Sequence, residues 1–413
     1  MAVPRYAAFR SAPFRALWIG MVVSNIGTQM QIVGQGWLVR DLSAAPVALG
    51  LVSLAAALPM IFVTPIGGAI ADRFPRRRLL AGTQTGMLLQ ALLLAALTLS
   101  GGVQLWHIVS LSMANSILLA IDNPTRQALL PDLVTADQLQ SAVSLNAAVW
   151  SGAALLGPAL GGILLAPLSP GGLFLVNAVS YLAVLYALVA LKGVPDRPSA
   201  RPDSVIVGVT NGLRYASRDG LTRNVLLLLL VGSLFGRSYQ TLMPIFARDV
   251  LGVGPDGYGL LLAAPGAGAI VGAFGLAAVR SMRRIDRVML LGLFCFCALV
   301  LLFTVSRNFA LDLAWLLAAG ISSTVFTASG ATLLQLHSPR PLRGRVMSLA
   351  TVANIGMSQL GGLLTATLAT VVGAPLAVGA AAVAAMAVAG LLAAPSGWRQ
   401  AAANVLAAPA EGV

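Results

Sequence analysis

Few side chains in this sequence have the chemistry of a catalytic residue or a metal ligand. Its 413 residues include two histidines, His107 and His337, and two cysteines, Cys295 and Cys297, that stand two positions apart in an apolar segment. On a helix this spacing directs the two thiols away from each other, so it predicts neither a disulfide nor a metal site. The sequence has no Gly-x-x-x-x-Gly-Lys-Ser/Thr loop that would bind a nucleotide phosphate. These patterns argue against an enzyme and against a protein that hydrolyses nucleotides itself.

Arg237 stands apart among the basic residues because it falls midway along an apolar segment, residues 224–247. A charge in a hydrocarbon environment is costly, so such a side chain is expected to line a cavity or to have a partner. Ser233, Gln240 and Thr241 share its face of a helix. The aspartates of the apolar segments fall near segment ends, so we expect an anionic or strongly hydrogen-bonding substrate group to be the partner. Hydrogen bonds to helix-end carbonyls or to one of those aspartates are the structural alternative.

Other polar side chains also interrupt the apolar segments. In lipid they are costly unless they line water or another helix. We therefore take them as candidates for the lining of a substrate cavity, with interhelical hydrogen bonding as an equal alternative. They are Asn25, Gln29, Gln35, Asn146, Gln240, Thr327, Asn354 and Gln359.

The segments that must position these side chains are those of a membrane protein. Hydrophobic residues make up 58% of the chain and charged residues 9%, which leaves too little polar surface to solvate a globular protein of this size. Apolar windows suited to crossing about 30 Å of hydrocarbon recur along the chain and predict an all-α protein with twelve transmembrane helices. They cover residues 14–39, 47–71, 79–99, 105–121, 139–165, 172–191, 224–247, 257–279, 288–305, 309–334, 346–372 and 375–394.

The basic residues predict the side of the membrane on which each loop lies. With the N-terminus inside and strict alternation, only Arg40, Arg248 and Arg307 of the 26 Arg and Lys residues fall on the outer side. Because loops rich in Arg and Lys stay in the cytoplasm, we expect a multi-pass inner-membrane protein with both termini cytoplasmic. The net charge of +13 is spread over short loops, so its expected partner is anionic membrane lipid and not nucleic acid.

The windows form two sets of six with a polar interval between them. Short patterns of the first set recur in the second, as in Ser144-Leu145 and Ser348-Leu349. We therefore predict two pseudo-symmetric six-helix bundles with a substrate site between the two halves, near mid-membrane. The predicted parts are an N-terminal bundle (residues 1–191), a cytoplasmic linker (192–223), a C-terminal bundle (224–394) and a cytoplasmic tail (395–413). Within the linker, residues 205–217 fit either a short helix on the membrane surface or a solvated loop.

A charged turn, Gly68-Ala69-Ile70-Ala71-Asp72-Arg73-Phe74-Pro75-Arg76-Arg77-Arg78, joins the second and third windows. Its Gly-x-x-x-Asp-Arg pattern followed by Arg-Arg resembles the loop between helices 2 and 3 of the major facilitator superfamily, except that Pro75 replaces a glycine and stiffens the turn. The stretch from Asp122 to Leu133, followed by Ser144-Leu145-Asn146, resembles the helix 4–5 loop of one branch of that superfamily. That branch contains enterobactin exporters and macrolide efflux pumps, which are drug:proton antiporters.

The resemblance implies which residues open and close the transporter. In the superfamily, the Asp of the charged turn, an Arg near helix 4 and the start of helix 11 form an ionic latch on the inner face. Carried over, Asp72 and Arg126 are the latch partners, and residues 345–348 supply backbone amides. Gly157-Pro158-Ala159-Leu160-Gly161-Gly162 resembles the core of the exporters' helix 5 motif, in which glycines allow close helix approach; a generic close crossing is the alternative. The implied gating residues are Gly68, Asp72, Arg73, Arg77, Asp122, Arg126, Gly157, Pro158, Gly161 and Gly162.

The function implied by the resemblance is secondary active export of a small amphiphilic molecule, a drug or a siderophore-like metabolite, by alternating access. Because no nucleotide-binding loop occurs, an ion gradient is the expected energy source, and proton antiport is the expected form of coupling. The protein is expected to act as a monomer with no bound cofactor or metal. Asp122, or else Asp41, is the candidate proton carrier. Proton-coupled uptake of a small metabolite is the alternative, and a membrane sensor or enzyme is a more distant one.

Overall fold

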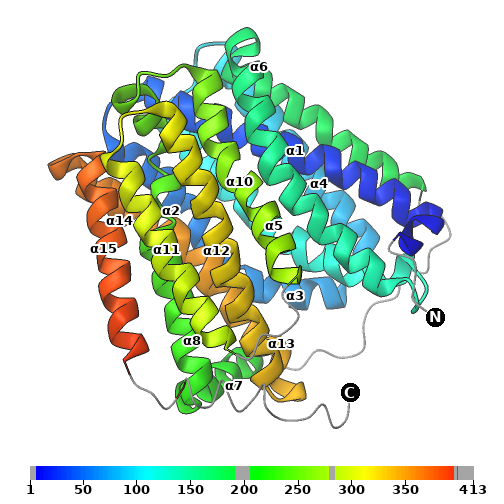
Figure 1. Ribbon diagram of the computed structural model, residues 1–413. Helices are drawn as coiled ribbons and strands as arrows, with labels where there is room; N and C mark the ends of the chain where they lie inside the picture. The colour runs from blue at the N-terminus through cyan, green and yellow to red at the C-terminus, as the bar shows by residue number, and fades with distance from the viewer. Residues whose placement is uncertain (1–5, 191–204, 279–283, 395–397, 399–413) are drawn as a thin grey trace. The chain divides into compact units, whose positions relative to one another are not determined.

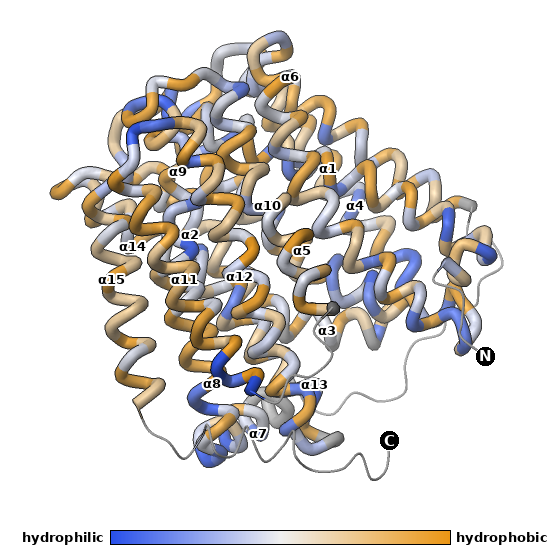
Figure 2. The backbone as a smooth tube through the Cα atoms, viewed as in Figure 1, coloured by the Kyte–Doolittle hydropathy of each residue, from blue (hydrophilic) through white to orange (hydrophobic). Residues whose placement is uncertain are grey.

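The computed structural model describes residues 6–190, 205–278, 284–394 and 398, and the regular elements in these parts of the chain are helices (Figure 1). Ten helical stretches there are long and apolar enough to cross a membrane. Figure 2 shows hydrophobic residues along the long helices and hydrophilic residues near helix ends and in α7. The predicted all-helical membrane class is therefore confirmed, while the number twelve stays a prediction. The tail at 395–413 and linker residues 192–204 lie outside the described positions, except Trp398.

The first half of the chain forms six α-helices and two short 3₁₀ turns. Ser11 caps the first long helix by accepting a hydrogen bond from the amide of Phe14. The elements are η1 (Ala7–Arg10), α1 (Ala12–Leu42), α2 (Pro46–Phe62), α3 (Thr64–Arg73), α4 (Arg76–Leu99), α5 (Leu105–Leu129), η2 (Leu130–Leu133) and α6 (Leu139–Ala190).

Proline explains two interruptions among these helices. The window at 47–71 is divided at Val63 into α2 and α3, because Pro65 has no N–H to continue the helical ladder. Within α6, two helices meet at the non-helical Ser169 (φ 60°, ψ 170°), which lies between the predicted windows at 139–165 and 172–191. Ser169 precedes Pro170, and a residue before proline is disfavoured in the helical region.

The second half contains three π-helical segments among its α-helices, and such segments often mark functional sites. The linker residues at 205–217 form a helix and not a loop, while the position of this helix on the membrane surface stays a prediction. The elements are α7 (Val205–Arg218), α8 (Gly220–Val231), π-helical η3 (Gly232–Gly236), η4 (Ser238–Gln240), α9 (Met243–Ile245), π-helical η5 (Phe246–Val250), α10 (Pro255–Ala278), α11 (Ile285–Val305), α12 (Phe309–His337), α13 (Arg340–Thr351), π-helical η6 (Val352–Gly356), α14 (Met357–Val372) and α15 (Ala374–Ala393).

The contacts divide the chain into two compact units. Unit 1 contains Met1–Ala44, Leu58–Pro202 and Val253–Ala263, and unit 2 contains the remainder. Each unit thus takes in one segment from the opposite half of the sequence. The first part of α2 belongs to unit 2, and the first part of α10 belongs to unit 1.

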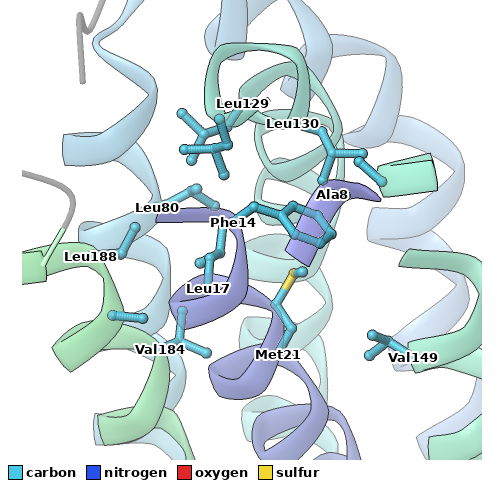
Figure 3. Packing of buried hydrophobic residues seen from close by; sticks show 13 residues of the cluster. Ala8, Phe14, Leu17, Met21, Leu80, Leu129, Leu130, Val149, Val184 and Leu188 are labelled. Atoms are coloured by element: carbon cyan, nitrogen blue, oxygen red, sulfur yellow. The ribbon is translucent and has the colours of Figure 1, made fainter. Parts of the chain in front are cut away.

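An apolar cluster holds the first helices of unit 1 together (Figure 3). Phe14, Leu17 and Met21 project from α1 and are each at most 1% exposed. They pack with Leu80 of α4 and with residues of η1, α5, η2 and α6. Burial of these side chains fixes α4 and α5 side by side, and the polar cluster described next lies on those two helices.

Candidate functional site

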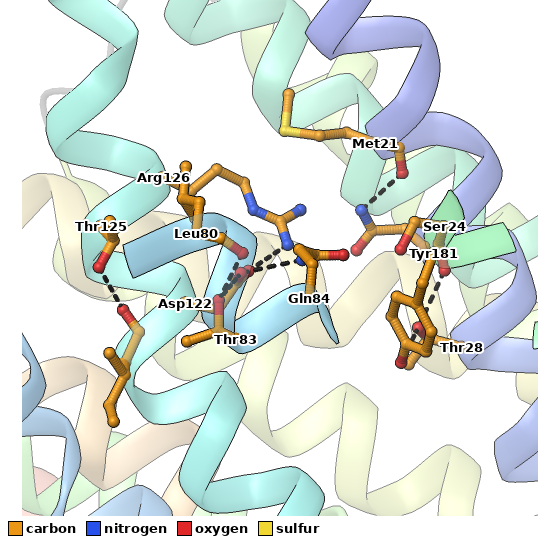
Figure 4. Close-up of polar contacts among 12 residues, drawn as sticks. Met21, Ser24, Thr28, Leu80, Thr83, Gln84, Asp122, Thr125, Arg126 and Tyr181 are labelled. Carbon is orange, nitrogen blue, oxygen red and sulfur yellow. Dashed lines mark hydrogen bonds and ion pairs between the residues drawn. The ribbon is translucent and has the colours of Figure 1, made fainter. Parts of the chain in front are cut away.

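A buried carboxylate, Asp122 of α5, is the centre of a charged cluster in unit 1 (Figure 4). Its Oδ1 accepts hydrogen bonds from Thr83 Oγ1 (2.8 Å) and Gln84 Nε2 (2.9 Å), both on α4. Its Oδ2 forms an ion pair with the guanidinium of Arg126, one helical turn further along α5. Asp122 is 0% exposed and Arg126 8% exposed. Three donors therefore stabilise the charged form of this carboxylate within the protein.

The partner of Arg126 differs from the one expected from the sequence. Arg126 is paired with Asp122 of its own helix, whereas the resemblance implied Asp72. The side chain of Asp72 lies outside the described part of the structure, so its role stays a prediction. In the same turn, Gly68 has open space beside its Cα and Arg73 is exposed. Arg77 is half-buried and takes part in a polar interaction.

Arg76 provides a second link between α4 and the end of α5, and the sequence analysis did not select it. Its Nη1 donates to the carbonyl oxygen of Ala128 (2.8 Å) and to Asp132 Oδ2 (2.7 Å). The side chains of Arg76 and Asp132 are 13% and 33% exposed. Both residues lie in stretches quoted above for their family resemblance, but their pairing depends on the packing of α4 against α5.

The exporter-like motif of α6 lies at two close helix crossings. A Cβ at Gly157 would overlap the side chain of Gln29 on α1, and one at Gly161 would lie 3.1 Å from Val33 Cβ. A Cβ at Gly162 would lie 2.6 Å from the Cα of Gly259 and 2.9 Å from the carbonyl oxygen of Pro255, both on α10. The glycines therefore let the backbones of α1 and α10 approach α6, which is the physical use expected for them.

The polar residues predicted on α1 have different surroundings. Asn25 donates to the Met21 carbonyl oxygen of its own helix (2.7 Å), and Gln35 donates to Ser112 of α5. Gln29 is half-buried against Gly157. Asn146 of α6 is also half-buried. Of this set, Gln35 alone forms a hydrogen bond to another helix among the described residues, so the remaining three stay candidates for a cavity.

A buried hydrogen-bond network inside unit 1 contains three residues that were not predicted, Gln31, Asn177 and Tyr181. Asn177 of α6 donates to Gln31 Oε1 on α1 (2.7 Å) and to Tyr181 Oη (3.3 Å). Thr28 shares a 3.2 Å hydrogen bond with Tyr181. Gln31 and Asn177 could have been selected because each is a polar residue in an apolar window, as the predicted residues are. The network ties α1 to the second part of α6.

Arg237 and Asn354 lie together in unit 2, although the sequence analysis selected them separately. Arg237 Nη1 donates to Asn354 Oδ1 across 2.9 Å. Arg237 stands between η3 and η4, and Asn354 lies within η6, so both occupy departures from α-helical geometry. Both are half-buried, and no carboxylate in the described residues lies within 4 Å of the guanidinium. The guanidinium therefore keeps a charge that no anion of the described residues balances at this distance.

Aromatic rings and glycines shape the backbone beside Arg237. A Cβ at Gly232 would lie 2.7 Å from the ring of Phe326, and one at Gly236 would lie 2.6 Å from the ring of Phe296. A Cβ at Gly361 of α14 would overlap the carbonyl oxygen of Leu234. Close packing on these sides fixes the path of η3, and with it the position of Arg237.

The other predicted polar residues of unit 2 are placed as follows. Gln359 Oε1 accepts a hydrogen bond from Ser53 of α2 (2.7 Å), and Ser53 also lies 3.4 Å from Thr241 Oγ1. Gln240 is exposed. Thr327 donates to the carbonyl oxygen of Ser323 in its own helix (2.9 Å). Gln359 therefore helps to hold α2 against α14, whereas Gln240 stays available for a ligand.

Comparisons with known proteins agree with this architecture. A family model described as transmembrane secretion effector matches residues 3–408. The staphyloferrin A transporter of Staphylococcus aureus is 27% identical over 84% of this chain and 87% of its own. The multidrug efflux pump Tap of Mycolicibacterium fortuitum is 25% identical over 88% of this chain and 91% of its own.

A solved structure shares the fold. It is that of a bacterial homolog of the human lysosomal transporter Spinster, with a TM-score of 0.74. The match covers 97% of this chain and 99% of that one at 14% sequence identity. At this identity the likeness concerns the fold alone.

Proposed function

The chain belongs to the transmembrane secretion effector family of the major facilitator superfamily and is a membrane transporter, not an enzyme, and from this premise we propose that it exports a small amphiphilic molecule in exchange for protons. A relative named as a multidrug efflux pump supports the direction, and a relative named as a staphyloferrin A transporter supports a cargo of that kind. The Arg and Lys distribution supports the proposed topology, an inner-membrane protein with both termini in the cytoplasm. We propose that it acts as a monomer with no bound cofactor.

The observation that carries the proposed cargo chemistry is the pair formed by Arg237 and Asn354. A guanidinium inside an apolar helix has lost most of its hydration, and one hydrogen bond from an amide oxygen does not balance its charge. An anionic substrate group would supply that balance, and a guanidinium can bind a carboxylate through two parallel hydrogen bonds.

Transport by purified protein in sealed proteoliposomes tests the direction of transport. The panel contains staphyloferrin A, a macrolide and a cationic dye, and each compound is offered with and without a pH gradient. Protein inserted with a known orientation is expected to move at least one compound from the cytoplasmic side outward as protons move in. Accumulation toward the cytoplasmic side, driven by inward proton flow, would instead identify an uptake permease.

The same assay separates the gate from the binding site. Asp72 and Arg73 are proposed to hold the cytoplasmic gate, so Asp72→Asn should slow transport while leaving binding of the cargo unchanged. Equal transport rates for Asp72→Asn and the wild type would refute this gating role.

A further inference from the structure

Asp312, in the first turn of α12, has surroundings opposite to those of Asp122. The residue is 0% exposed, so neither water nor lipid reaches it. Both carboxyl oxygens are enclosed and have no hydrogen-bond partner among the described residues. An unpaired buried carboxylate is rare because most buried polar groups are hydrogen-bonded.

The Ser306 hydroxyl and the Arg307 guanidinium lie near the carboxyl group of Asp312, but neither has hydrogen-bonding geometry toward its oxygens. Asn308 caps α12 by accepting hydrogen bonds from the amides of Ala310 (3.0 Å) and Leu311 (3.2 Å). Arg307 directs Nη1 to the carbonyl oxygens of Thr304 (3.2 Å) and Ser306 (2.8 Å). Arg307 therefore interacts with the carboxyl of Asp312 electrostatically but forms no salt bridge with it.

The helices packed against α12 bring no other charge to this end. The neighbours of α12 in unit 2 are α8, α11, α13 and the part of α10 from residue 264 onward. That part of α10 carries no charged residue. Because only residues 306–308 separate α11 from α12, the two run antiparallel, and the first turn of α11 lies by the far end of α12. The far end of α12 is also where His337 meets Asp219, just before α8. The charged residues with described side chains on these neighbours are Arg223, Asp286, Arg287, Arg343 and Arg345.

These surroundings favour the protonated form of the Asp312 carboxyl group over the ionised form. An ionised carboxylate enclosed without a close hydrogen-bond donor loses its hydration, and the Ser306 hydroxyl and Arg307 guanidinium nearby offset only part of that loss. The protonated acid carries no charge and costs far less to enclose. Asp122 presents the reverse case, since three donors balance its charge. The packing of α12 therefore accommodates Asp312 with a proton bound.

We propose that Asp312 binds the proton whose entry drives export. The inference rests on the proposed proton antiport and moves the proton carrier from Asp122, which the sequence analysis had favoured, to α12. On the proposed topology the first turn of α12 faces the outer side, from which protons enter. The carboxylate takes up one proton there and forms an O–H bond. It releases that proton in another conformation, in which water reaches the carboxyl group.

Two transport modes measured on the same proteoliposomes test the proposal. Counterflow exchanges labelled for unlabelled cargo without a gradient, whereas accumulation requires the proton gradient. With the panel compound that the wild type exports, Asp312→Asn should retain counterflow and lose gradient-driven accumulation, falling to the level without a gradient. Asp312→Glu, which can still bind a proton, should keep both. Gradient-driven accumulation by Asp312→Asn, or loss of counterflow together with it, would overturn the proposal.

A direct readout needs no variant. Dicyclohexylcarbodiimide modifies protonated carboxyl groups in apolar surroundings, and it is applied during cargo counterflow, when the protein passes through the conformation that opens the site. Mass spectrometry of the treated wild-type protein should find Asp312 modified and Asp122 unmodified, and modification should decline as the pH is raised. An Asp312 that stays unmodified throughout counterflow would refute the inference. Wild-type protein that exchanges cargo but ignores the proton gradient would refute the antiport instead.

Discussion

Arg237 Nη1 lies 2.9 Å from Asn354 Oδ1, and this hydrogen bond joins two irregular segments that are 117 residues apart in the sequence. Each segment interrupts a long apolar helix, and the interruption turns a polar side chain toward the other. The relationship explains how a guanidinium is held within an apolar region while part of its hydrogen-bonding capacity stays free for a ligand.

Replacement of Arg237 should affect charged cargo more than uncharged cargo. Arg237→Ala is expected to raise the concentration for half-maximal transport of anionic compounds by about 10- to 100-fold, since a hydrogen bond to a charged group contributes about 1.5–3 kcal/mol. Neutral compounds should change little. Concentration dependence of transport in proteoliposomes measures this, and Arg223→Ala, which removes an exposed guanidinium from α8, is the matched control. An equal loss for all compounds, with a lower unfolding temperature, would assign Arg237 a structural role.

The α6–α10 crossing should not tolerate a methyl group at Gly162. An alanine Cβ there would lie 2.6 Å from the Cα of Gly259, and neither backbone can move away without separating the helices. Gly162→Ala is expected to destabilise the protein by about 1–3 kcal/mol and to reduce transport. Thermal unfolding in detergent measures the first effect. Gly152→Ala is the control, because its Cβ would meet nothing within 4 Å; equal behaviour of the two variants would contradict the prediction.

The Asp122 cluster should be sensitive to removal of one charge and less sensitive to removal of both. Asp122→Asn leaves the guanidinium of Arg126 buried without a counter-charge, at an expected cost of about 3–5 kcal/mol. The double variant with Arg126→Gln should recover part of that loss. Denaturant unfolding of the two single variants and the double variant measures the coupling. Asp132→Asn, which removes the partially exposed partner of Arg76, is the control and should cost at most about 1 kcal/mol. If the losses of Asp122→Asn and Arg126→Gln simply add in the double variant, the buried pair does not couple the two residues.

The contact between Asp219 and His337 should make stability depend on pH in the acid range. Asp219 accepts hydrogen bonds from the Thr222 amide (2.8 Å) and lies 3.0 Å from His337 Nε2. Burial raises the pKa of Asp219, but the hydrogen bonds from Thr222 and His337 outweigh it and hold that pKa below its usual value. A lowered pKa means that the carboxylate contributes stability above its unfolded pKa of about 3.9 and loses it as the pH falls through the folded pKa.

Unfolding temperatures in detergent between neutral pH and pH values below that range measure this effect. The wild type is expected to lose more stability on acidification than Asp219→Asn, which has no carboxylate to protonate there. Parallel pH curves for the two proteins would show that Asp219 contributes nothing to the acid dependence.

Several features were predictable because they depend on residues close together in the sequence. The length of each apolar window, the cost of a charge within it and the Arg content of short loops are local quantities. They predicted the membrane class, most helix ranges and the unusual position of Arg237. The junction within α6 falls between two predicted windows. The division between α2 and α3 was missed, because one proline interrupts a helix without changing its hydrophobicity.

By itself the sequence determined that this is a helical membrane protein of a transporter family, with small residues at one helix crossing and a single arginine deep in an apolar segment. Only the tertiary structure decided the pairings: Arg126 with Asp122, Arg76 with Asp132, Arg237 with Asn354, and Asp312 with no partner among the described residues. Helical periodicity states which face of a helix a side chain occupies, but not which helix lies opposite. Hydrogen bonding and desolvation depend on distances of a few ångströms between segments far apart in the chain, and packing alone determines those distances.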